Sequence, residues 1–155
     1  MSDSTAEATF PGSGILMADI VGTAALAVVS VVTGVVGNDA TEVASLVVAA
    51  ALFGGGCLAF AVGFWRALGR SRTEVVDLAG IFWLTGSAPA EVARRLRGLL
   101  VVQSLVAVAS VAAVRPPFAI MAPVWGIGLI TLWASRHATF PARPRVRGAY
   151  RGPTG

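Results

Sequence analysis

The sequence predicts an all-α membrane protein with four transmembrane helices and a short interfacial helix at the inner leaflet. Two observations predict this class. The 155-residue chain is 55% hydrophobic, only 13% charged and has a mean hydropathy of +0.77, whereas soluble domains carry about 25% charged residues. The apolar residues also fall into four runs near the length of about 20 residues that a membrane-spanning helix needs. We expect one transmembrane domain over residues 14–137.

The first predicted helix covers residues 15–37 and contains one charged residue, Asp19. Residues 1–13 are small, polar and slightly acidic, so we expect a disordered N-terminal tail. After the helix, residues 38–42 (NDATE) are rich in turn-forming and acidic residues, which indicates a short connection to the next helix.

The second predicted helix covers residues 45–65 and is rich in glycine. Gly55, Ala59 and Gly63 form a row of small residues on one face, and such rows let two helix backbones approach closely in lipid. The consecutive glycines Gly54–Gly56 also allow a second reading, in which they act as a hinge.

Residues 73–84 are too few to cross a bilayer, because twelve helical residues reach only about 18 Å. Glu74 and Asp77 would share one face of a helix here, with apolar residues clustered on the other. This pattern predicts an interfacial helix that lies along the inner leaflet. The alternative is a helix that packs under the bundle against protein.

The third and fourth predicted helices cover residues 89–114 and 118–134. The third begins with an amphipathic, arginine-rich stretch. In the fourth, Pro123 predicts a kink, and we expect Gly126 to take part in helix packing. Residues 138–155 are rich in Pro, Gly and Arg, which predicts a disordered basic C-terminal tail.

The distribution of arginine predicts how the chain is threaded. All twelve basic residues are Arg, and only Arg115 lies in a turn on the opposite side from the rest. Loops on the cytoplasmic side are enriched in basic residues. We therefore expect both termini and the segment between the second and third helices to be cytoplasmic. We expect four arginines to contact anionic lipid headgroups: Arg94, Arg95, Arg97 and Arg136.

Asp19 is the most unusual candidate, because a carboxylate inside a membrane helix is costly unless it is paired or protonated. Arg66 and Gln103 are expected at a similar depth and are its two candidate partners. We interpret Asp19 as a headgroup-level or paired charge; the alternative is a role in proton or ion coupling. Ser104 and Ser110, with Gln103, are expected to form hydrogen bonds between helices.

No sequence motif indicates catalysis, a cofactor or a metal. The chain has one cysteine, Cys57, and one histidine, His137, which lie in different segments. The sequence contains no motif for a nucleophile with its base, for a phosphate-binding loop or for a dinucleotide-binding fingerprint. We predict a non-enzymatic protein without a cofactor. The basic charge is explained by membrane topology, so nucleic acid is not expected as a partner.

Two segments carry a resemblance to a known group: FWLTGSAPAEVARRLRGLLVVQS and VRPPFAIMAPVWGIGLITLWASRHATFP. They resemble small, uncharacterised multi-pass membrane proteins of actinobacteria, and the Ala-, Val-, Gly- and Arg-rich composition is similar to that of proteins from high-GC genomes. The resemblance covers roughly the C-terminal half. It implies a bacterial membrane protein and assigns no activity or site residues.

These observations favour a non-enzymatic accessory or structural subunit of the cell membrane that packs against other membrane proteins or against copies of itself. Small size, few polar groups within the predicted helices and small-residue helix faces support this hypothesis. The alternative is a small transporter or channel that uses Asp19, Gln103 and the Gly54–Gly56 hinge.

Overall fold

The predicted all-α fold is confirmed by a computed structural model, which describes residues 11–113 and 118–144. Within these ranges the only β-type pairing is a single bridge between Glu74 and Ala142. The elements are, in order, α1 (Ser13–Val36), α2 (Asp39–Arg70), α3 (Leu78–Phe82), α4 (Ala90–Ala113), the 3₁₀ turn η1 (Phe118–Met121) and α5 (Pro123–His137).

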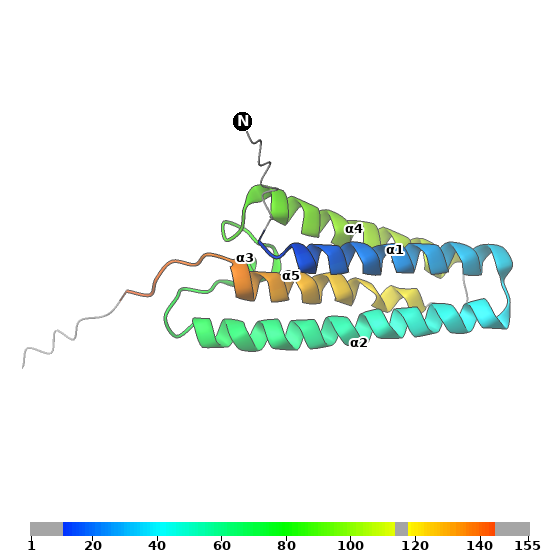
Figure 1. The fold of residues 1–155 in the computed structure, drawn as a ribbon, viewed down its shortest axis with the longest axis horizontal. Coiled ribbons are helices and arrows are strands. Elements are labelled where there is room, and N and C mark those ends of the chain that lie inside the picture. The colour runs from blue at the N-terminus through cyan, green and yellow to red at the C-terminus, as the bar shows by residue number, and fades with distance from the viewer. Residues whose placement is uncertain (1–10, 114–117, 145–155) are drawn as a thin grey trace, which may run out of the picture.

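The four long helices run lengthwise and alternate in direction (Figure 1). The start of α1, the end of α2, the start of α4 and the end of α5 therefore lie together at one end of the bundle, with α3. We call this the arginine end, because it holds the eight arginines of the described ranges: Arg66, Arg70, Arg72, Arg94, Arg95, Arg97, Arg136 and Arg143.

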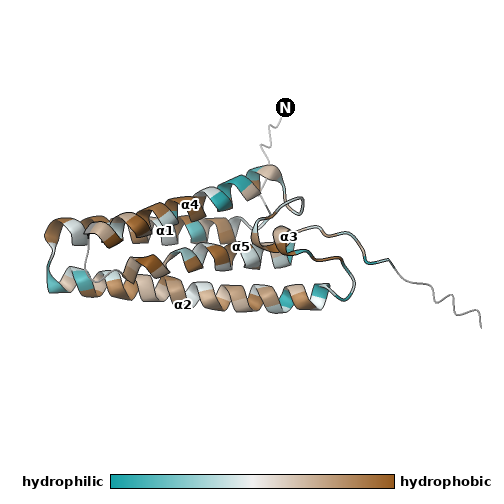
Figure 2. Ribbon diagram, turned by 180° about the vertical axis from the view of Figure 1, so that it is seen from behind, coloured by the Kyte–Doolittle hydropathy of each residue, from teal (hydrophilic) through white to brown (hydrophobic). Residues whose placement is uncertain are grey.

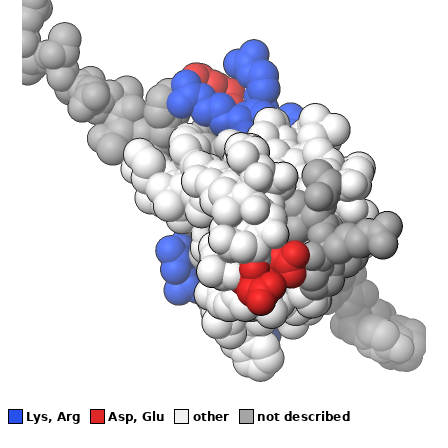
Figure 3. All heavy atoms as spheres, turned by 90° about the vertical axis from the view of Figure 1, so that its right-hand side faces the viewer, with Lys and Arg blue, Asp and Glu red and all other residues white. Residues whose placement is uncertain are grey.

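The opposite end is formed by the turn between α1 and α2, and we call it the acidic end. Asp39 and Glu42 lie there in the first turn of α2. Figure 3 views the molecule from this end: an acidic patch faces the viewer, and basic atoms appear only at the edges. Figure 2 shows the complementary pattern along the helices, where hydrophilic residues gather at the start of α4 and the end of α2.

Four helical segments are long and apolar enough to cross a membrane: Ser13–Val36, Asp39–Arg70, Ala90–Ala112 and Phe118–His137. They indicate a multi-pass membrane protein. The last segment is 56% buried within the bundle, against 22% to 28% for the other three. The helix α5 is therefore the central one, and α1, α2 and α4 present most of their apolar surface to the surroundings.

The helix α2 is longer than predicted, because it begins at Asp39 rather than near residue 45. The Asn38 side chain accepts a hydrogen bond from the Thr41 backbone N–H (2.9 Å), and the Thr41 hydroxyl accepts one from the Asn38 N–H (3.2 Å). This reciprocal cap fixes the start of the helix, so most of the expected acidic turn is helical. With 32 residues, α2 is about 48 Å long and exceeds a hydrocarbon core of about 30 Å.

The helices α2 and α5 approach each other closely through glycine. A β-carbon added at Gly56 would lie 2.5 Å from the Val124 carbonyl oxygen, and one added at Gly63 would lie 2.8 Å from the Leu132 backbone nitrogen. Gly55 faces the Trp125 ring, and Ala59 packs against the apolar core that includes Trp133. The row of small residues predicted on α2 therefore lies in the interface with α5.

The predicted interfacial helix over residues 73–84 is wrong in its extent. Only Leu78–Phe82 is helical, and it begins at Asp77, whose side chain accepts a hydrogen bond from the Gly80 N–H at 3.1 Å. Ile81 is buried, and α3 packs against α5. The weighed alternative, a helix packed under the bundle against protein, describes this short element better.

The predicted disordered tail is also wrong for its first residues. Residues 138–144 run beside residues 73–75: the Val75 N–H donates to the Pro141 carbonyl and the Arg143 N–H donates to the Thr73 carbonyl, both at 2.8 Å. Ala138 is buried. These contacts explain why residues 74 and 75 are not helical, because the backbone around Glu74 pairs with the C-terminal segment. The predicted N-terminal tail is wrong at its last residues, because α1 begins at Ser13 and the Pro11 carbonyl accepts a hydrogen bond from Trp133 Nε1 at 2.9 Å. The predictions for residues 1–10 and 145–155 lie outside the described residues.

Pro123 begins α5 instead of kinking a continuous helix. The preceding residues form the 3₁₀ turn η1, and proline at the first position of a helix lacks only an N–H that would have no helical partner. The fourth predicted helix is thus a short 3₁₀ turn followed by an α-helix that extends to His137.

Candidate functional site

Three polar side chains meet inside the bundle, between α1 and α4, and we call them the polar cluster: Asp19, Thr23 and Gln103. The Gln103 Nε2 donates to Asp19 Oδ1 at 2.6 Å and to Thr23 Oγ1 at 2.7 Å. The Thr23 hydroxyl donates to the Asp19 backbone carbonyl at 2.7 Å. All three side chains are buried, and Asp19 is fully inaccessible (0% exposed).

Helix periodicity explains how the cluster forms. Asp19 and Thr23 are four residues apart on α1, so they lie one above the other on the same face. That face meets α4, where Gln103 lies more than halfway along the helix. Of the two partners predicted for Asp19, Gln103 is the one that the structure places beside it. Asp19 is enclosed by protein and paired with Gln103.

Two atoms of the cluster lack a hydrogen-bond partner in the part of the chain that the structure describes: Asp19 Oδ2 and Gln103 Oε1. They are the second oxygen of the Asp19 carboxylate and the amide oxygen of Gln103. Both atoms are hydrogen-bond acceptors, so they cannot bond to each other unless the Asp19 carboxylate is protonated. The cluster thus joins α1 to α4 and leaves two buried acceptors unpaired.

Trp125 brings a further polar atom to the same region. Its indole lies between glycines of two helices. The ring faces Gly55 of α2, and Nε1 faces Gly22 of α1. Gly22 lies about one helical turn after Asp19. The Trp125 Nε1 is buried and has no acceptor among the described residues. On the neighbouring residue of α5, a β-carbon added to Gly126 would lie 2.7 Å from Gln103 Oε1. Gly126 therefore makes room for the Gln103 amide.

The remaining polar candidates are arranged differently from expectation. Arg66 is exposed on α2, and no hydrogen bond or ion pair joins it to Asp19. The Ser104 hydroxyl donates to the Leu100 carbonyl and the Ser110 hydroxyl to the Val106 carbonyl, both within α4. The predicted interhelical bonds at these two serines are therefore wrong. Serine often bonds to the carbonyl four residues earlier in its own helix.

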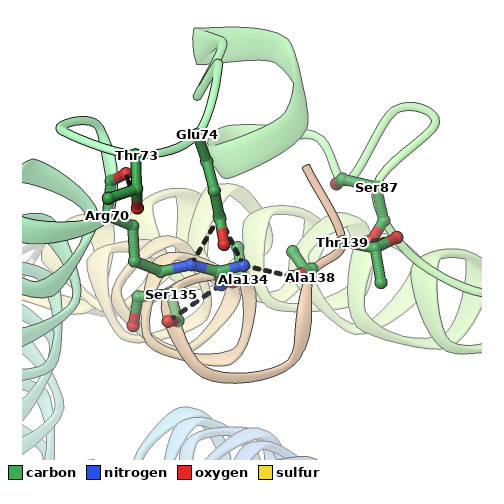
Figure 4. Close-up of polar contacts among 8 residues, drawn as sticks. All are labelled: Arg70, Thr73, Glu74, Ser87, Ala134, Ser135, Ala138 and Thr139. Atoms are coloured by element: carbon green, nitrogen blue, oxygen red, sulfur yellow. Dashed lines mark hydrogen bonds and ion pairs between the residues drawn. The ribbon is translucent and has the colours of Figure 1, made fainter. Parts of the chain in front are cut away.

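A second polar site lies at the arginine end and is formed around Arg70, the last residue of α2 (Figure 4). Its Nη1 donates to the carbonyls of Ala134 (3.4 Å) and Ser135 (3.2 Å), and its Nη2 donates to that of Ala138 (2.8 Å). The last carbonyls of a helix lack partners within the helix and carry partial negative charge. Arg70 therefore stabilises the end of α5.

Two neighbours hold the Arg70 guanidinium in this position. Glu74 accepts from Nε at 2.9 Å and lies 2.7 Å from Nη2, and the Phe140 ring lies under the guanidinium, 5.1 Å from its carbon to the ring centroid. Nearby, the Thr139 N–H donates to the Ser87 carbonyl at 2.9 Å. The Arg70 site thus ties α2, the segment before α3 and the start of the C-terminal segment to α5. Sequence reasoning missed it, since Arg70 was interpreted only as a topology signal.

The four arginines predicted to contact lipid headgroups all lie at the arginine end. Arg94, Arg95 and Arg136 are exposed, and Arg95 forms an ion pair with Glu91 at 2.5 Å. The Arg97 Nε donates to the Ala93 carbonyl at 3.0 Å. Arg94 has neither an ion pair nor a hydrogen bond among the described residues.

Cys57 and His137 do not assemble into a reactive site with other residues. Cys57 is exposed on the outer face of α2, and His137 lies against Trp133 at the end of α5, with 5.4 Å between ring centroids. Within residues 11–113 and 118–144, no group of three or more His, Cys, Asp or Glu residues could hold a metal ion.

Comparisons with protein-family models, with curated proteins and with solved structures find no match for this chain.

Proposed function

We propose that this protein is a non-enzymatic accessory or structural subunit of a bacterial cytoplasmic membrane that packs against another membrane protein or a second copy of itself. The proposal includes the threading argued from the arginines, with the arginine end in the cytoplasm. The observation that carries the proposal is a groove between α1 and α4 near the acidic end.

We call this groove the outer groove. Small residues and valines from both helices line it: Ala27, Ser30, Val31, Gly34 and Val35 of α1, and Val106, Ala109 and Ser110 of α4. A β-carbon added at Gly34 would meet no atom within 4 Å. The Ser30 hydroxyl is buried without a partner among the described residues. Small residues and an unpaired hydroxyl are the features through which transmembrane helices associate in lipid.

Site-specific crosslinking from the outer groove tests this proposal. A photo-crosslinking residue placed at Val31 should yield a discrete adduct with another membrane protein or with a second copy, identified by mass spectrometry after purification in mild detergent. Adducts with lipid alone would contradict the proposal.

A matched pair of variants separates the groove from the rest of the surface. Gly34→Leu should fill the outer groove and abolish the adduct. Gly54→Leu is the control, because a β-carbon there also meets no atom within 4 Å and Gly54 lies on α2, outside the groove. If the Gly34→Leu variant retained the partner as fully as the wild type, the outer groove would not be the contact surface.

A second candidate function, a small proton- or ion-coupled transporter, is favoured by the two unpaired acceptors of the polar cluster. Buried ionisable residues within membrane helices commonly mark ion or proton paths. The expected hinge has less support, because α2 is continuous through Gly54–Gly56, and both Gly55 and Gly56 face α5 at close distance. Flux in reconstituted vesicles that Asp19→Asn abolishes would favour this candidate. No flux, or flux unchanged in Asp19→Asn, would remove it.

A further inference from the structure

Two adjoining hollows lie at the arginine end, beside the first half of α4, which contains its three arginines. One is lined by Ala90, Arg94, Arg97, Gly98 and Val101, and the other by Leu16, Ile20, Arg94, Arg95, Gly98, Leu99 and Val102. They share Arg94 and Gly98, so they adjoin each other along this face of α4. We call the two together the inner groove, and it is separate from the outer groove, with which it shares no residue.

The charge of the inner groove is not fully neutralised by the protein. Arg95 is paired with Glu91, whereas Arg94 is exposed and has no carboxylate or other hydrogen-bond partner in the described ranges. The Arg97 Nε bonds to the Ala93 carbonyl, which holds this side chain along the helix, where it lines the groove. The mouth of the groove therefore offers guanidinium groups to an external anion.

The floor and walls of the inner groove are apolar. At Gly98 a β-carbon would meet no atom within 4 Å, so the absence of a side chain leaves open space below Arg94. Leu16 and Ile20 of α1 and Leu99 and Val102 of α4 line the same space. A cationic mouth above an apolar floor at the end of a membrane-spanning helix matches the two parts of a phospholipid, an anionic headgroup and an acyl chain.

We propose that the inner groove binds one anionic phospholipid of the inner leaflet, with its phosphate at Arg94 and Arg97 and an acyl chain over Gly98. This proposal rests on the membrane location and on the cytoplasmic arginine end, and it does not depend on the accessory role. It differs from general attraction between arginines and lipid, because it names one groove with a cationic mouth and an apolar floor.

Native mass spectrometry of the full chain, extracted from vesicles that contain equal amounts of phosphatidylglycerol and phosphatidylcholine, tests the proposal. The wild type should retain one phosphatidylglycerol molecule in preference to phosphatidylcholine. Loss of one basic contact, worth about 1 kcal/mol near a membrane surface, should weaken retention about fivefold in Arg94→Gln. Gly98→Leu should abolish retention, because its side chain would occupy the space of the acyl chain.

Two control variants keep the result specific. Arg136→Gln removes an exposed arginine at the same end that lines neither hollow, and Gly54→Leu fills open space on α2. Both should retain the lipid as the wild type does. Equal retention of the two lipids, unchanged retention in Arg94→Gln and Gly98→Leu, or equal losses in the controls would each overturn the proposal. Absence of the protein from the membrane fraction would instead contradict the membrane location itself.

Discussion

The contact of α5 with α2 and the contact of α1 with α4 are built in opposite ways. The α2–α5 interface brings backbones together at glycines and is closed at the arginine end by Arg70. The α1–α4 interface contains a buried carboxylate with an unpaired oxygen and leaves a groove open toward each end. The helices α2 and α5 are therefore the closely packed pair of the bundle, and α1 and α4 carry the open surfaces that a partner or a lipid could occupy.

The largest expected effect is at the α2–α5 interface. Gly56→Leu would drive a side chain into the Val124 carbonyl and the Trp125 backbone, which cannot move aside without separating the helices. We expect a loss of about 3 kcal/mol in the free energy of unfolding, measured by denaturant unfolding in detergent micelles. Gly54→Leu, with open space around it, should change this value by less than about 0.5 kcal/mol. Equal losses in both variants would show that the close approach is not what holds α2 to α5.

The polar cluster gives the next largest effect. Gln103→Leu removes the donor to Asp19 and Thr23 and leaves the carboxylate buried with no side-chain donor, which should cost about 1–2 kcal/mol of stability. The double variant Asp19→Leu/Gln103→Leu should be more stable than Gln103→Leu alone, because replacing both partners removes the unpaired groups. Additive losses in this double-mutant cycle would contradict the interpretation of the cluster as a coupled network.

A smaller effect is expected at the Arg70 site. Arg70→Met keeps the apolar stem but leaves the last carbonyls of α5 without their donor, and we expect a loss of about 1 kcal/mol. Proteolysis between residues 138 and 144 should become faster at the same time, because Arg70 bonds to the start of that segment. An unchanged cleavage rate would show that the backbone pairing with residues 73–75 suffices to hold the segment.

The smallest effect is expected for the ion pair between Arg95 and Glu91, whose side chains are both more than 40% exposed. Glu91→Gln should change stability by less than about 0.5 kcal/mol, because exposed pairs at this spacing on a helix contribute little. A larger loss in the same unfolding assay would mean that Arg95 stabilises the α1–α4 interface through Glu91.

Sequence patterns predict the parts of this fold that depend on residues close together in the chain. The four spans follow from apolar run length, and the packing row at Gly55, Ala59 and Gly63 follows from helix periodicity. The contact between Asp19 and Gln103 was among the predicted pairings because both were expected at similar depth. Predicting these features requires only the periodicity of an α-helix and the approximate depth of each residue along its helix.

The features that sequence reasoning missed depend on contacts between distant segments. Arg70 bonds to carbonyls more than sixty residues away, and backbone carbonyls have no sequence signature. The backbone around Glu74 pairs with residues 141–143 instead of forming a helix, which the amphipathic pattern of residues 73–84 does not reveal. The spacing of Asn38 and Thr41, which form the cap that starts α2, is by contrast a local signal.

Four membrane crossings with the arginine end in the cytoplasm underlie both proposals, and cysteine labelling in intact cells measures this topology directly. In a Cys57→Ala background, Arg72→Cys and Arg136→Cys should react with a membrane-impermeant maleimide only after the cells are opened. Asp39→Cys should react in intact cells. Labelling of Arg72→Cys and Arg136→Cys from opposite sides, or of Asp39→Cys from the same side as both, would contradict the account.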